Sequence, residues 1–182
     1  MEDLKRSEET NNNDTKQQLA YAQGRAFGDA LRHMTEEEAT GAELASGDYL
    51  IGYAVERAEG MYAYDGEELV WLNPTDENAH IEVSVRSARD GRMLPGLTVT
   101  VTVEDQDGSE VGSEIHPFLW HPWLYHYGRN WTIPSEGEYR VRVHVTAPLT
   151  MMRHDREHGA AFSEDAEVVF EGVQLPVGQK LS

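Results

Sequence analysis

The stretch HIEVSVRSA, residues His80–Ala88, alternates polar and apolar side chains from His80 to Arg86. Alternation with a period of two is typical of a β-strand that buries one face. The apolar residues of this stretch fall on the core face, and the opposite face receives His80, Glu82, Ser84 and Arg86. We therefore predict a strand that carries a histidine and a carboxylate on one side, about 7 Å apart along the backbone.

The same alternation recurs over most of the chain and defines the fold class. Further strands are predicted at Tyr49–Ala58, Met61–Tyr64, Glu68–Leu72, Leu97–Asp105, Glu138–Ala147 and Ala166–Leu175. Turn sequences such as DGEE, DQDG and PSEG separate these segments. Seven short strands with little helix between them predict an all-β fold, an immunoglobulin-like antiparallel β-sandwich with an N-terminal helical extension.

The extension is predicted from a change of period. Residues 1–14 are polar and indicate disorder. From residue 15, apolar side chains recur every three or four positions as far as Met34, and TEEE (Thr35–Glu38) fits a capping box that starts a second short helix ending near Ala45. The predicted organisation is a disordered segment 1–14, a helical extension 15–46, a β-sandwich metal-binding domain 47–176 and a tail 177–182.

The charge of the chain limits its partners. It has 33 acidic and 15 basic residues, a formal charge of −18, and only three of its basic residues are lysines. A surface this negative repels phosphate backbones, so we predict that nucleic acid is not a partner. Acid-rich and lysine-poor surfaces also favour folding in concentrated salt, where charges are strongly screened. We therefore predict a halophilic protein that is more stable in molar salt than in dilute buffer.

Several functions are excluded by residues that the chain lacks. It has no cysteine, which excludes disulfides, thiolate nucleophiles and iron–sulfur clusters. The motifs G-x-S-x-G and H-E-x-x-H are absent, and so is a phosphate-binding loop. No apolar run is long enough to span a bilayer, and no signal-peptide pattern occurs at the N-terminus. We therefore expect a binding protein and not an enzyme. The protein is expected either to stay in the cytoplasm or to have had an export signal removed from this sequence.

Histidines and aromatic rings gather in LWHPWLYHYGRN, residues 119–130. Two nearby prolines, Pro117 and Pro122, predict a loop here and not a helix or a central strand. The histidines in and beside this stretch are His116, His121 and His126. Neutral imidazole is a common ligand of copper, iron and zinc, and aromatic rings hold imidazoles in fixed orientations. The alternative is that these rings plug one end of the sandwich or form a contact surface.

A further candidate stretch is MMRHDREHG, residues 151–159, which contains His154 and His158 beside two methionines. Thioether sulfur adds affinity for copper, although a methionine pair also fills gaps in packing. Taken alone, none of these signals establishes a metal site.

The order HIEVSV, HYGRN, GEYRVRVHV and RHDREHG resembles the periplasmic metal-binding proteins of bacterial high-affinity ferrous-iron uptake. That family is known as the iron/lead permease-associated periplasmic component and includes a treponemal lipoprotein antigen. The resemblance covers about residues 79–172, and the acidic composition suggests a divergent member of haloarchaeal type. It implies an immunoglobulin-like sandwich, a homodimer, an extracytoplasmic location, a membrane iron permease as partner, and one site for copper or iron.

The resemblance also implies the ligands, which fall on His80, Glu82, His126 and His154. The family has a methionine ligand in an MPM-like loop, and this sequence departs from it. Direct spacing puts Leu119 at that position, whereas a shifted loop puts His121 there, so His121 or His116 is expected to replace the thioether. Imidazole in place of sulfur favours Cu(II), iron or zinc over Cu(I). Residues expected to surround the ligands are Trp123, Tyr127, Arg153 and Asp155.

The sequence thus predicts a copper- or iron-binding carrier in iron acquisition, with zinc as a further possible ion. The alternative is a metal-free β-sandwich interaction module that binds a protein or carbohydrate through the aromatic loop 118–127. Metal content of protein purified without a histidine tag separates the two.

Overall fold

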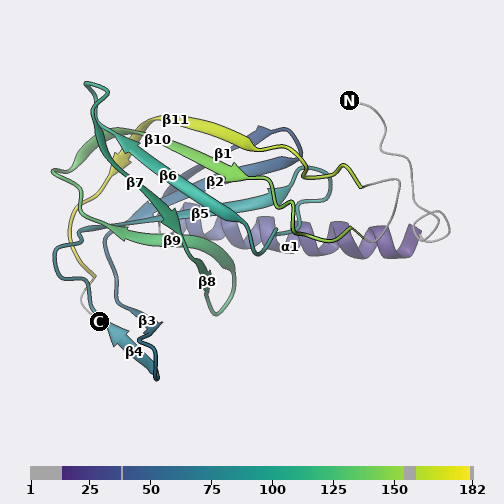
Figure 1. Cartoon of the computed structure of the whole chain (residues 1–182), viewed down its shortest axis with the longest axis horizontal. Helices are drawn as coiled ribbons and strands as arrows, with labels where there is room; N and C mark the ends of the chain where they lie inside the picture. The colour runs from purple at the N-terminus through teal and green to yellow at the C-terminus, as the bar shows by residue number, and fades with distance from the viewer. Residues whose placement is uncertain (1–13, 38, 154–158, 181–182) are drawn as a thin grey trace.

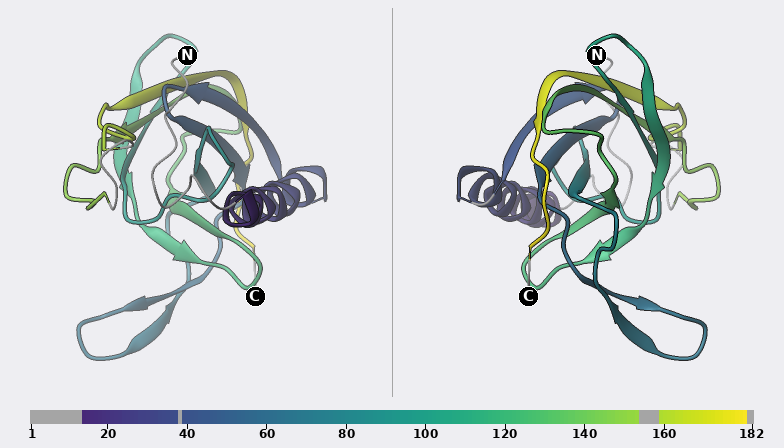
Figure 2. Two further views of the ribbon diagram at one scale, coloured as in Figure 1. Left: turned by 90° about the vertical axis from the view of Figure 1, so that its right-hand side faces the viewer. Right: turned by 90° about the vertical axis from the view of Figure 1, so that its left-hand side faces the viewer.

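The computed structural model describes residues 14–37, 39–153 and 159–180 of the chain (Figure 1). Of the segment 1–14 predicted to be disordered, residues 1–13 lie outside the described residues, and Asp14 is the first residue of a helix. Two antiparallel sheets stack face to face, and one long helix lies against them (Figures 1 and 2). The predicted all-β sandwich with an N-terminal helix is confirmed.

The first sheet has five strands in the order β1-β2-β5-β9-β8, all antiparallel. Their bounds are β1 Thr40–Ser46, β2 Tyr49–Glu56, β5 Ala79–Ser87, β8 Phe118–Trp120 and β9 Tyr125–Trp131. The second sheet has the order β11-β10-β6-β7. Its strands are β6 Thr98–Glu104, β7 Glu110–His116, β10 Gly137–Thr146 and β11 Ala166–Leu175.

The core lies between the two sheets and consists largely of the alternating valines that predicted the strands. Val83 of β5, Val101 of β6 and Val143 of β10 are all fully buried in one cluster. The polar residues between them face outward, as alternation requires. Burial of apolar area at about 25 cal/mol per Å² makes this cluster the main source of stability.

Helix α1 (Asp14–Glu37) covers the outer face of the five-stranded sheet (Figure 2). Met34 on the helix packs with Ala54 of β2 and Leu124 of the β8–β9 loop. Gly24 lets the helix touch the turn that follows β5, because a Cβ atom built there would lie 1.8 Å from the carbonyl oxygen of Asp90. The described helix is long, but it is not apolar enough to cross a membrane.

Two local predictions from the sequence were wrong. The second helix expected up to Ala45 is replaced by strand β1, which pairs with β2 from Thr40 to Ser46. The Thr35 hydroxyl bonds backwards to the carbonyls of Leu31 and Arg32, so it continues α1 and does not cap a new helix. The aromatic stretch, expected as a loop, forms the hairpin β8–β9. It tolerates the nearby prolines because β8 is an edge strand.

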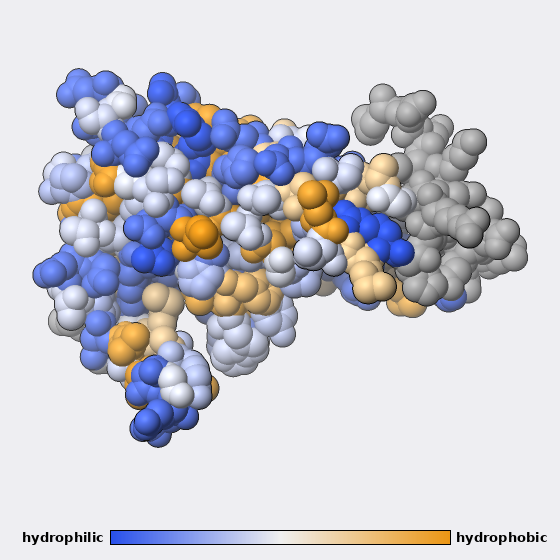
Figure 3. Space-filling model, viewed as in Figure 1, coloured by the Kyte–Doolittle hydropathy of each residue, from blue (hydrophilic) through white to orange (hydrophobic). Residues whose placement is uncertain are grey.

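A two-stranded hairpin, β3 (Met61–Tyr64) and β4 (Leu69–Leu72), projects away from the sandwich (Figures 1 and 2). Most of the surface in Figure 3 is hydrophilic, in keeping with the formal charge of −18. On the hairpin, Tyr62 and Trp71 form an exposed cross-strand pair with ring centroids 5.1 Å apart.

Candidate metal centre

Neighbouring strands β5 and β9 bring the predicted ligands together. In their antiparallel register His80 lies opposite Asn130, and Glu82 lies opposite Gly128. Because alternate residues share a face, His80 and Glu82 of β5 point to the same side as His126 of β9. This is the outer face of the five-stranded sheet, turned away from the core.

The three side chains offer donor atoms to a common point. One atom each from His80, Glu82 and His126 lie within 4.8 Å of one another. Glu82 Oε1 is 3.7 Å from His80 Nε2 and 3.3 Å from His126 Nε2. Two ligands that each lie about 2.1 Å from one ion in tetrahedral geometry are about 3.4 Å apart. The observed separations therefore suit one transition-metal ion with little movement of the side chains.

Burial keeps both imidazoles in the form that binds metal. His80 is fully buried and His126 is 4% exposed. Burial, followed by the nearby His80 and His121 rings, lowers the pKa of His126 from 6.5 to about 3. Burial likewise lowers the pKa of His80. Both rings are therefore neutral near pH 7, and their contacts with Glu82 are not ion pairs. Two neutral imidazoles and a glutamate side chain are donor types that bind transition-metal ions.

Asn130 orients His80, a role that was not predicted from the sequence. The Asn130 side-chain amide donates to the Glu59 carbonyl at 2.8 Å, and its Oδ1 accepts from the Glu59 backbone N–H at 3.3 Å. This fixes Oδ1 as an acceptor, so the His80 Nδ1–H must donate to it at 2.8 Å. The lone pair of His80 is then on Nε2, which faces the cluster. Such outer hydrogen bonds are what hold a ligating histidine in one tautomer.

Gly128 provides the space in which the two rings approach each other. A Cβ atom built there would lie 2.8 Å from Leu119 Cδ1, 3.0 Å from His80 Nε2 and 3.1 Å from His126 Cδ2. Leu119 is paired with His126 across β8 and β9. A hydrocarbon side chain therefore borders the cluster at the position where direct spacing puts the family's methionine.

The two candidate replacements for that methionine differ in their position. The ring centroid of His121 lies 6.1 Å from that of His126, but His121 has no donor atom inside the 4.8 Å cluster. His116 is buried, and its Nε2 accepts a hydrogen bond from the Trp131 indole at 3.1 Å. His121 thus adjoins the cluster, whereas the His116 Nε2 is already engaged elsewhere.

The residues expected around the ligands fall in several places. Trp123 packs edge-on against His121, with centroids 4.9 Å apart. Tyr127 faces the opposite side of β9, in the core, where its hydroxyl donates to the Leu94 carbonyl at 2.7 Å. Arg153 donates to carbonyls of its own loop, including that of Ala161 at 2.9 Å, and does not reach the cluster. His154 and Asp155 lie outside the described residues.

Acidic residues extend the site on one side. Oxygens of Glu56, Glu59 and Glu82 also lie within 4.8 Å of one another, and Glu59 Oε1 is 4.0 Å from His80 Nε2. The ammonium group of Lys180 contacts Glu56 and lies 3.4 Å from Glu59. These residues come from β2, the following loop and the C-terminal segment, so the sequence offered no signal that they would meet.

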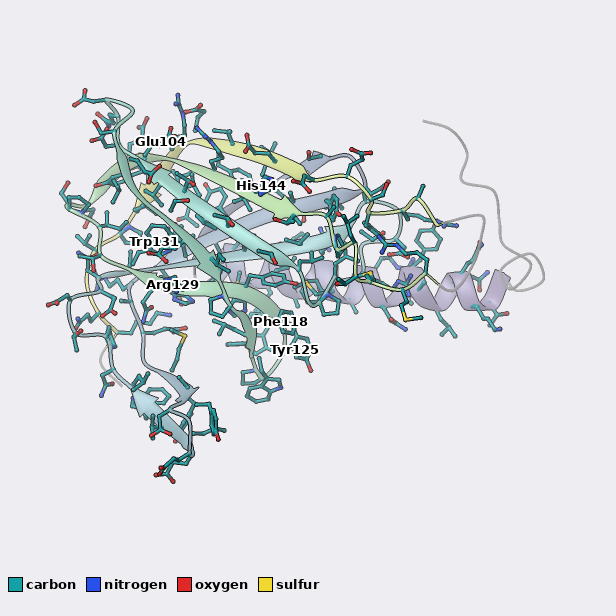
Figure 4. The ribbon with its side chains drawn as sticks, in the orientation of Figure 1. Glu104, Phe118, Tyr125, Arg129, Trp131 and His144 are labelled. Carbon is teal, nitrogen blue, oxygen red and sulfur yellow. The ribbon has the colours of Figure 1, made fainter. Side chains whose placement is uncertain are left out.

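A cavity of about 280 Å³ opens beside the cluster, between helix α1 and the sheet. Leu31 and Met34 of the helix line it together with Glu82 and His126. Phe118 of β8 and Tyr125 of β9, both labelled in Figure 4, stack with centroids 5.7 Å apart on the Tyr127 side of the hairpin, opposite to His126. The cluster therefore lies between helix α1 and the five-stranded sheet and is reached through this cavity.

The fold and the site together define the class of this protein: a β-sandwich with a centre lined by two histidines and a glutamate. The chain belongs to the Fe2+ transport protein family, whose sequence profile matches residues 34–173. The resemblance predicted from the sequence is confirmed. No curated protein matches the chain.

Solved structures share the fold at low sequence identity. Copper-reconstituted P19 from Campylobacter jejuni is 16% identical with a TM-score of 0.60, covering 76% of this chain and 97% of that chain. A copper-bound variant of FetP from uropathogenic Escherichia coli is 16% identical with a TM-score of 0.55, covering 75% and 97%. The segment before residue 34, which includes most of α1, lies outside the family match.

Proposed function

We propose that this protein is a carrier that binds a copper or iron ion at His80, Glu82 and His126 and serves iron acquisition. The observation that carries the proposal is the convergence of three donor atoms within 4.8 Å, two of them on buried imidazoles. Family membership supports it, and so does the shared fold of the copper-bound P19 and FetP structures. The ion is the cargo of such a protein.

The donor set favours Cu(II), iron or zinc over Cu(I). Imidazole and carboxylate are harder donors than thioether, and Leu119 contributes no sulfur at the cluster. The protein would release its cargo to a membrane permease from an extracytoplasmic location, and it would act as a homodimer. His121 and His154 remain proposed as additional ligands.

We expect no enzymatic activity of its own. The cluster lies beneath helix α1, and the adjoining cavity is about 280 Å³. A site enclosed by protein ligands suits binding and release of an ion better than turnover of an organic substrate.

The test is titration of untagged protein with Cu(II), Fe(II) and Zn(II), with His126→Ala as the variant. His144→Ala is the matched control, because His144 lies on β10 of the other sheet and contacts Asp165 at 3.2 Å (Figure 4). We expect one ion per chain for the wild type and for the control, and a loss of affinity in His126→Ala. Equal uptake by all three proteins would reject the site. Absence of metal from the wild type would favour the metal-free interaction module.

A further inference from the structure

The cavity beside the cluster exists because small side chains form its floor. Gly52 and Ala54 of β2 and Ser84 of β5 line it on the outer face of the five-stranded sheet, and helix α1 passes over them. Glu82 and His126 also line this cavity. Open space therefore adjoins two of the three proposed ligands, on the side that faces the helix.

Met34 of α1 lies at this end of the cavity. Its side chain is 8% exposed, and it packs with Ala54 and Leu124. Ala54 is the residue opposite Glu82 in the register of β2 and β5, and Leu124 comes two residues before His126. Met34 therefore adjoins both Glu82 and His126 from the helix side, and it lines the same cavity of about 280 Å³ as they do.

The backbone at Met34 is held in place over the sheet. The His33 ring packs edge-on against Trp123 of the β8–β9 loop, with centroids 6.1 Å apart, and the Met34 carbonyl accepts a hydrogen bond from the Ala39 N–H at 3.0 Å. The methionine side chain itself is unbranched and has three rotatable bonds. Its sulfur can therefore adjust to an ion while the helix stays in place.

Other donor groups that line the cavity are already engaged or are weak ligands. The Glu43 carboxylate is held by Arg86 at 2.7 Å, and the Thr35 hydroxyl bonds back to carbonyls of its own helix. Ser84 offers only a neutral hydroxyl. The chain has no cysteine, so any sulfur that binds an ion belongs to a methionine. Among the methionines of the described residues, Met34 is the one that lines this cavity.

We propose that Met34 is a fourth ligand of the centre, which binds the ion through its thioether sulfur from the helix side. This inference rests on the proposed function. His80, Glu82 and His126 supply three donors, and a tetrahedral transition-metal site takes four. Thioether is a soft donor that selects Cu(I), whereas on Cu(II) it is a weak axial ligand. Met34 thus extends the site, whose other donors favour Cu(II), iron or zinc, to Cu(I).

The experiment is X-ray absorption at the copper edge on the full chain loaded with Cu(I) under ascorbate, combined with anaerobic competition against a Cu(I) chelator. The variant is Met34→Leu, which conserves volume. Met93→Leu is the matched control, because Met93 packs against the core between the sheets and lines a different cavity.

We expect a sulfur neighbour about 2.3 Å from copper in the wild type and in the control, and its loss in Met34→Leu. Cu(I) affinity should fall at least about tenfold in Met34→Leu, whereas Cu(II) affinity should stay within about threefold of the wild type. The control should keep the wild-type affinity for both ions.

Several results would overturn the assignment of Met34. A wild-type spectrum with only nitrogen and oxygen neighbours would exclude the thioether while leaving the three-ligand site intact, and this measurement needs no variant. A sulfur neighbour that persists in Met34→Leu, or an equal loss of Cu(I) affinity in both variants, would also exclude Met34. Wild-type protein that binds no copper in either oxidation state would reject both this inference and the proposed function.

Discussion

Replacement of Gly128 by alanine perturbs the proposed centre without removing a ligand. The new methyl group would lie 3.0 Å from His80 Nε2 and 3.1 Å from His126 Cδ2, against about 3.5–4.0 Å for an ordinary contact between carbon atoms. Leu119 can rotate away from it, but His80 is held by its 2.8 Å hydrogen bond to Asn130. The rings must therefore move by several tenths of an ångström, and the methyl group crowds the nitrogen that faces the ion.

The size of the effect follows from this crowding. Metal–ligand distances tolerate deviations of about 0.2 Å, so displacement of two rings should weaken Cu(II) binding by about 10- to 100-fold, or about 1.4–2.7 kcal/mol. Overpacking should also lower the free energy of unfolding of the apo protein by about 1–3 kcal/mol. Because the apo protein contains no ion, its unfolding reports the strain in the fold alone, separately from the weaker Cu(II) binding.

The assay is competition with a Cu(II) chelator, combined with urea unfolding of the apo protein. Gly137→Ala is the matched control, because a Cβ atom built at Gly137 meets nothing within 4 Å. This control corrects for the stabilisation of about 0.4–1 kcal/mol that a glycine-to-alanine change gives by reducing the conformational entropy of the unfolded chain. Identical Cu(II) affinity in the two variants would refute the placement of the ion between these rings.

Three further predictions concern charge. Glu82→Gln should weaken metal binding at least about tenfold, because an amide is a poorer metal ligand than a carboxylate. The apo protein should become no less stable to urea, because a neutral amide of the same shape replaces the carboxyl group; an apo protein several kcal/mol less stable would contradict this. The pKa of His126 and of His116 is about 3 in the folded protein and near 6.5 when unfolded, so the unfolded chain binds more protons below pH 6.5. The free energy of unfolding should fall from pH 6.5 downward, by up to about 1.4 kcal/mol per pH unit for each ring, and His126→Gln should reduce that slope in urea titrations at pH 7.5 and 5. Lys180→Gln should raise Cu(II) affinity severalfold in dilute buffer and less in molar salt, because a cation beside Glu59 is removed; equal affinity at low salt would argue against this coupling.

The fold could be predicted because alternation is a local property. HIEVSVRSA and EYRVRVHVTA show which residues are buried without knowledge of their neighbours, and β5 and β10 lie within one residue of the predicted bounds. Strand β1 could not be predicted in this way. It is an edge strand with mostly exposed side chains, and its pairing with β2 outweighs the local helical signal.

The candidate site was predictable only in part, because alternation shows which residues share a face of one strand but not which strands are neighbours. His80 and Glu82 share a face by alternation, but their proximity to His126 depends on β5 and β9 being neighbours in the sheet. Asn130 follows the same alternation from His126 through Gly128, so it could have been inferred once β9 was known to be a strand. The approach of Lys180 is a tertiary contact from a distant segment, which no spacing in the sequence encodes.

The most direct test of the central claim is a crystal structure of the Cu(II)-loaded protein with anomalous scattering measured at the copper edge. Our account predicts one copper ion per chain, with His80 Nε2, a Glu82 oxygen and a His126 nitrogen each about 2.0–2.2 Å away. Copper bound elsewhere on the chain, with these three side chains left as they are, would contradict it.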